Sequence, residues 1–77
     1  MQIVFVLQKP GDAVLDIFNE RADLAAMVSD PGLPAGLHSS RVDLAGLAPG
    51  VYFYKVTLKY SDGSVERLKA GKFLRIR

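Results

Sequence analysis

The chain of 77 residues contains no cysteine, which excludes disulfides and any metal site built on thiolates. It contains a single histidine, so a cluster of histidine ligands is excluded as well. No apolar run approaches the roughly 18 residues that a membrane helix needs, and no Gly-rich phosphate-binding loop with its following Lys occurs. We therefore expect no metal, no cofactor and no membrane span, and a core built from apolar packing alone.

The composition predicts one folded domain, residues 1–77, because 49% of the residues are hydrophobic and the chain is short. The net charge of +2 hides an asymmetry. Residues 1–54 carry three basic and six acidic side chains, whereas residues 55–77 carry seven basic and two acidic ones. The last third is therefore a basic segment joined to a mildly acidic body.

Alternation of apolar and polar residues with a period of two predicts an all-β protein. Strands are expected over 1–7, 13–18, 37–44, 51–60 and along the return segment 65–77, with a short strand or one helical turn over 24–28. Two prolines and two glycines predict a loop over 29–36, and Asp62-Gly63 predicts a hairpin turn. About seven short strands with regular turns indicate an antiparallel β-sandwich.

The expected core face of the strand 51–60 is the one without lysines, made up of Tyr52, Tyr54, Val56, Leu58 and Tyr60. Burial of these rings is worth more to so small a domain than a sugar-stacking surface would be. On the return segment the same alternation places four residues on the core face, with Gly71 as a candidate bulge that would redirect Lys72: Leu68, Ala70, Leu74 and Ile76.

The segment around His38 contains the residue types of a catalytic triad, but in a poor arrangement. Neighbouring residues on a strand point to opposite faces, so His38 and Ser39 diverge, and Asp43 lies far along the chain. His38 and Ser40 share a face, yet nothing nearby would orient the imidazole. We therefore expect that the protein is not an enzyme.

The basic segment is the most distinctive candidate site. Pairing of its two strands is expected to bring six side chains into one positive patch on an outer face: Lys55, Lys59, Arg67, Lys69, Arg75 and Arg77. Such a patch fits an acidic polysaccharide or an acidic protein surface, and the lack of interleaved aromatics argues against nucleic acid. The alternative is a solvated face whose lysines prevent edge-to-edge aggregation.

Apolar residues outside the expected core indicate a protein partner. If they face outwards, they form an exposed apolar patch that is larger than a soluble monomer usually has. Association with a second copy, or docking against a neighbouring domain, would bury it. The residues concerned are Val4, Val6, Val14, Phe18, Val51, Phe53 and Phe73.

A resemblance to a known family follows from several motifs that together cover nearly the whole chain. The most specific is the run G-L-x-x-G-V-Y-F-Y over 46–54, preceded by Ala35-Gly36 and His38 and followed by the final segment 72–77. These motifs resemble the Ig-like C-terminal sorting domain of cargo of the bacterial type IX secretion system, and equally the Ig-like domain of the flagellar hook-capping protein. The chain departs from the family pattern at Ala22, where a glycine is usual, and at Val42, where an aromatic residue is common.

The resemblance implies an Ig-like sandwich that is secreted or held at a bacterial cell surface. It implies a non-catalytic sorting or anchoring module, with the secretion machinery or a passenger domain as partner. The alternatives are a self-associating structural or assembly subunit and, with less support, a carbohydrate-binding accessory module. Residues 1–12 lack the features of a signal peptide, so export is expected to depend on a segment elsewhere.

Overall fold

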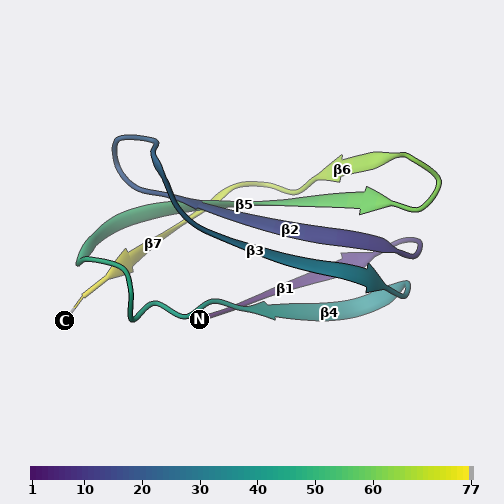
Figure 1. Ribbon diagram of the computed structural model, residues 1–77, viewed down its shortest axis with the longest axis horizontal. Coiled ribbons are helices and arrows are strands. Elements are labelled where there is room, and N and C mark those ends of the chain that lie inside the picture. Colours follow the sequence, from purple (N-terminus) through teal and green to yellow (C-terminus); the bar gives the residue numbers. More distant parts are fainter. Residues whose placement is uncertain (77) are drawn as a thin grey trace.

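The computed structural model describes residues 1–76, and it confirms the all-β prediction: seven antiparallel strands form two sheets (Figure 1). The smaller sheet contains two strands and the larger one contains five. The strands are β1 (Gln2–Leu7), β2 (Gly11–Phe18), β3 (Leu24–Leu33), β4 (Gly36–Arg41), β5 (Gly50–Tyr60), β6 (Val65–Arg67) and β7 (Gly71–Arg75).

The larger sheet is organised around β5, which pairs with β2 along one side and with β6 and β7 along the other. Strand β3 adds to β2 and forms the far edge, so the order is β3-β2-β5 followed by β6 and β7. β5 is the longest strand, with 11 residues, and it has the clearest alternation in the sequence. β1 and β4 form the smaller sheet, which lies below the larger one in Figure 1.

The core lies between the sheets and follows the predicted period of two. Ile17 of β2 and Leu58 of β5 are fully enclosed, and Phe5 and Leu7 of β1 face them from the smaller sheet. The predicted core face of β5 is confirmed for Tyr52, Val56, Leu58 and Tyr60, whereas Tyr54 is only half-buried.

The expected loop over 29–36 is wrong for its first five residues, because β3 continues to Leu33. A β-bulge absorbs the Pro31-Gly32 pair: Ala13 faces Asp30 and Gly11 faces Leu33, so the β3 side has one residue more. Gly32 takes a φ of 66° there, and its N–H donates to the Asp12 carboxylate at 2.8 Å. Proline is tolerated at this position because β3 is an edge strand.

The return segment is interrupted just before Gly71, the candidate bulge position in the sequence, and the interruption overturns part of the predicted facing. Thr57 pairs with Arg67 and Tyr54 pairs with Gly71, so the β6–β7 side contains one extra residue and the facing reverses between the two strands. Leu68 packs on the core as predicted, but Ala70, Leu74 and Ile76 are exposed instead of buried. Phe73 occupies the inner side and stacks on Tyr52, with ring centroids 5.5 Å apart.

The two sheets are linked by a polar contact and by the ends of the smaller sheet. Ser40 of β4 is buried, and its hydroxyl donates to the Asp30 carboxylate of β3. β4 ends at Arg41, three residues earlier than predicted, although Val42 stays in the core. Main-chain hydrogen bonds between Met1 and Val42 continue the β1–β4 pairing by one residue.

The turn between β2 and β3 keeps the backbone shape that glycine favours. Ala22 takes a φ of 67°, in the left-handed region. The Asn19 side-chain oxygen accepts the N–H groups of Arg21 and Asp23, which holds the turn together.

Candidate functional site

The candidate site is the side of the larger sheet that points away from the smaller sheet, hereafter the outer face. Residues directly opposite each other on paired strands point to the same side, so the β2–β5 register defines its rows. From one end to the other, four rows cross the two central strands: Phe18–Phe53, Asp16–Lys55, Val14–Thr57 and Asp12–Lys59.

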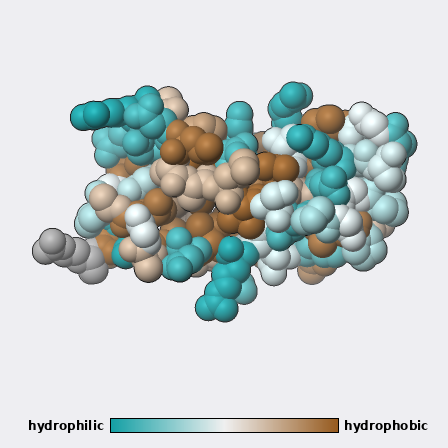
Figure 2. Space-filling model, viewed as in Figure 1, coloured by the Kyte–Doolittle hydropathy of each residue, from teal (hydrophilic) through white to brown (hydrophobic). Residues whose placement is uncertain are grey.

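The outer face is rich in accessible apolar side chains. Phe53 is 41% exposed at the centre of the sheet, and Val14, Phe18 and Val51 are half-buried beside it. The edge strands add four residues whose side chains are about half exposed or more: Leu24, Met27, Val65 and Leu74. In the view of Figure 2, apolar side chains gather over the middle of the molecule, where β2 and β5 lie in Figure 1.

Four cations lie on the outer face, along β5 and the strands next to it. Lys55 and Lys59 are exposed on β5, and Arg67 lies opposite Thr57, between them. Lys72 lies opposite Phe53 and therefore shares this side. The amino group of Lys55 lies 5.4 Å from the Phe18 ring centroid, a cation–π contact across the β2–β5 boundary.

Two aspartates of β2 accompany these cations, and sequence reasoning missed them as part of the site. Asp16 is level with Lys55 and Asp12 is level with Lys59. The outer face is therefore a pair of adjacent stripes, acidic and apolar on β2 and basic and apolar on β5. The only sign in the sequence is the same two-residue alternation in 12–18, and its use depends on knowing that β2 pairs with β5.

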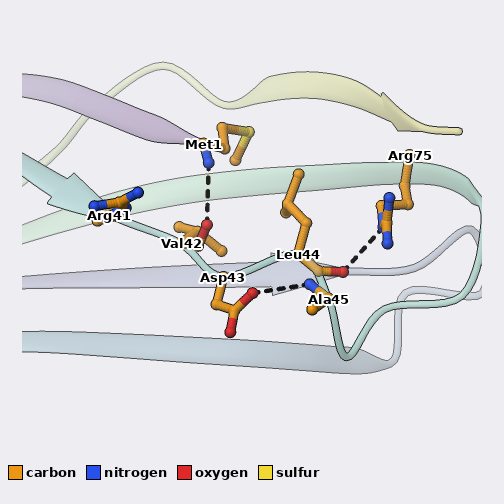
Figure 3. A pocket seen from close by; sticks show the side chains of 7 residues that line it. All are labelled: Met1, Arg41, Val42, Asp43, Leu44, Ala45 and Arg75. Atoms are coloured by element: carbon orange, nitrogen blue, oxygen red, sulfur yellow. Dashed lines mark hydrogen bonds between the residues drawn. The ribbon is translucent and has the colours of Figure 1, made fainter. Parts of the chain in front are cut away.

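Arg75 does not join the other cations, so the predicted placement is wrong for this residue. It is half-buried on the inner side of β7, where its Nε donates to the Leu44 carbonyl at 2.9 Å and its Nη1 donates to that of Ile76. Figure 3 shows it in an open pocket of about 670 Å³ that Met1, Arg41 and the segment 42–45 also line. The reversal of facing between β6 and β7 is the cause. Lys69 is exposed between these strands, and Arg77 lies outside the described residues.

The only ion pair within residues 1–76 lies at the turn end of the molecule, just beyond the Asp12–Lys59 row. The Lys9 ammonium donates to the Asp62 carboxylate at 2.6 Å. This contact, together with hydrogen bonds from Ser64, lowers the pKa of Asp62 well below its usual range. The hydrogen bond to Asp62, and then the Asp62 charge, raise the pKa of Lys9.

Tyr60 anchors the same end of the core. Its hydroxyl donates to the Glu66 carboxylate at 2.5 Å and accepts the N–H of Gln8 at 3.4 Å. The bond to Glu66 and the burial of the ring both raise the pKa of the Tyr60 phenol.

The His38 segment does not assemble a triad in the structure. The His38 Nε2 lies 2.6 Å from the Pro34 carbonyl oxygen, and Ser40 bonds Asp30 instead of the imidazole. Asp43 accepts the N–H of Ala45 in the loop that follows β4. Tyr52 and Tyr60 are buried, so the tyrosines do not make an exposed stacking surface.

Comparisons of the chain with protein-family models, with curated proteins and with solved structures found no match. Between residues 1 and 76 there is no helix that could span a membrane. Over the same range, no three His, Asp or Glu side chains come together in a way that could hold a metal ion.

Proposed function

We propose that the protein is a non-catalytic interaction module that docks onto a protein partner through its outer face. The observation that carries this proposal is the exposed position of Phe53 on a central strand, surrounded by Phe18, Val51 and Leu74. Apolar side chains of this size, collected on one face and rimmed by charges, mark a surface that another protein covers.

The biological form of this docking is sorting or anchoring of a secreted bacterial protein. The support is the sequence resemblance to type IX sorting domains, and one structural detail agrees with an Ig-like fold. The Tyr52 hydroxyl, at the start of β5, donates to the Ala48 carbonyl four residues upstream at 2.5 Å. This local geometry is typical of the tyrosine corner in Ig-like sandwiches.

An export assay tests this role. The chain is fused behind a reporter that carries a signal peptide and is expressed in a bacterium with a type IX system. We expect the reporter at the cell surface or in the medium. Phe53→Lys is expected to abolish this delivery, because a charge replaces the central apolar contact. Val4→Lys is the matched control, since Val4 is 63% exposed on the outer side of the smaller sheet.

Retention of the fusion in the periplasm would refute the sorting role. Normal delivery of the Phe53→Lys fusion would refute the docking face while leaving the sorting role intact.

A further inference from the structure

We propose that the outer face binds a second copy of this chain, face to face, across a two-fold axis that runs along the strands between β2 and β5. The inference rests on the proposed function, because it names the partner of the same docking face. Its basis is the way charges and apolar groups are ordered across the four rows.

A two-fold axis in this position places β2 of one copy over β5 of the other without a shift along the strands. The two members of a row are at the same height along the strands. Each β2 residue therefore faces, in the second copy, the β5 residue with which it pairs in its own chain. Asp16 faces Lys55 of the second copy and Asp12 faces Lys59 of the second copy, and the symmetry makes each of these contacts twice. The acidic stripe of each copy therefore meets the basic stripe of the other.

The apolar rows match under the same operation. Phe18 faces Phe53 of the second copy, so four phenylalanine rings surround the axis at one end of the interface. Val14 faces Thr57 of the second copy in the next apolar row. Aromatic residues are enriched in protein interfaces, and opposite charges add complementarity.

The charge order also selects this axis over the other two-fold axis that lies in the plane of the face. An axis perpendicular to the strands would place β2 over β2 and β5 over β5. Aspartates would then face the aspartate stripe and lysines the lysine stripe, which is repulsive. Only the axis along the strands gives opposite charges throughout.

The single copy leaves these charges available. Among residues 1–76 no ion pair involves Asp12, Asp16, Lys55 or Lys59, although Asp12 accepts one main-chain N–H. A paired length of eight residues and a width of four strands give a face of roughly 500 Å² in each copy at the usual strand spacing and rise. This is at the small end of stable interfaces, so we expect a dimer that dissociates on dilution.

The experiment is a charge swap between two variants. Asp16→Lys and Lys55→Asp each place two like-charge contacts in their own homodimer. Each substitution is expected to raise the dimer dissociation constant by about a hundredfold, at about tenfold per contact. In an equimolar mixture, residues 16 and 55 again carry opposite charges across the interface. We therefore expect a heterodimer with nearly wild-type affinity, measured by sedimentation equilibrium and native mass spectrometry.

Two matched variants control for charge alone. Asp23→Lys makes the same change in the turn between β2 and β3, and Arg41→Asp makes a similar change on the smaller sheet. Neither is expected to alter the dimer dissociation constant by more than about threefold. Circular dichroism at low concentration checks that the Asp16→Lys and Lys55→Asp monomers remain folded.

Three outcomes would overturn the inference: a wild-type monomer at up to about 1 mM, a dimer that neither swap weakens, or swaps whose mixture fails to form a heterodimer. These results are separate from the export assay. A monomer whose Phe53→Lys fusion loses delivery would keep the docking face and replace the second copy by another protein. A dimer whose fusion is never exported would keep the inference and remove the sorting role.

Discussion

Gly11→Ala is expected to be among the most damaging single-methyl changes in the chain. A Cβ at this position would lie 2.4 Å from the Lys59 carbonyl oxygen and 2.9 Å from the Tyr60 Cα, both main-chain atoms of β5. Ordinary contact begins at 3.4 Å, so β2 and β5 must separate by about 1 Å at the point where they start to pair. We expect a loss of about 3 kcal/mol in the free energy of unfolding, as for severe overpacking of a core.

This loss would be a large part of the total, because a chain of this length is stabilised by roughly 4–12 kcal/mol. Urea unfolding followed by far-UV circular dichroism measures it, with an unchanged m-value expected. Gly46→Ala is the matched control: nothing lies within 4 Å of the added Cβ, so stability should change by about 0.5 kcal/mol or less. A Gly11→Ala protein within about 0.5 kcal/mol of the wild type would refute the close approach of the two strands.

Three further predictions follow from local geometry. Ala22→Gly is expected to raise the free energy of unfolding by about 0.5 kcal/mol, because relief of the left-handed conformation exceeds the added entropy of the unfolded chain; an unchanged urea midpoint would contradict this. Tyr60→Phe is expected to lower stability by about 1.5 kcal/mol at pH 7, because Glu66 loses its hydroxyl donor. The pKa of Tyr60 is raised in the folded state, so its contribution is complete below the ordinary tyrosine pKa of about 10 and is lost as the pH rises through the folded value. Thermal unfolding between neutral pH and alkaline pH should therefore show a decline that Tyr60→Phe reduces. The pKa of Asp62 is lowered, so its pair with Lys9 contributes above the ordinary aspartate pKa and is lost as the pH falls below it. Thermal unfolding between neutral and acidic pH should show this loss as a decline that Asp62→Asn reduces, and a decline parallel to that of the wild type would argue that the pair contributes nothing.

Strand content and core facing were predictable where alternation is uninterrupted. Ile17 on β2 and Leu58 on β5 are buried as the two-residue period requires, and Phe5 and Leu7 follow the same rule on β1. These positions depend only on local order along one strand, which the sequence displays directly.

The bulge in β3 could not be placed from composition, whereas Gly71 marked the place of the second interruption. Pro31-Gly32 has the residues of a loop, yet an edge strand absorbs both through one extra residue. The extra residue before Gly71 reverses the facing that follows, so Phe73 packs partly buried on the inner side, Leu74 is exposed and Arg75 turns inwards. The reason for glycine at 71 is also tertiary, because an added Cβ would lie 2.2 Å from the Tyr54 ring.

The candidate site was predictable only in part for the same reason. The basic side chains of β5 and β6 were found from alternation, but their acidic neighbours depend on β2 lying beside β5. β5 and β6 are joined by a four-residue turn that contains Asp62-Gly63, so the sequence indicates that these two strands pair. β2 and β5 are separated by more than thirty residues, and no local sequence feature indicates that they pair.

The interruptions of the larger sheet have a consequence for how the protein behaves when it is concentrated. An uninterrupted outer strand is a template for lateral growth, in which further chains add through main-chain hydrogen bonds. Here one margin contains a proline without an N–H group, next to the bulge at Gly32, and the other is broken between β6 and β7. Both margins of the larger sheet therefore resist lateral growth, so this sheet should not seed fibres when the molecules are crowded.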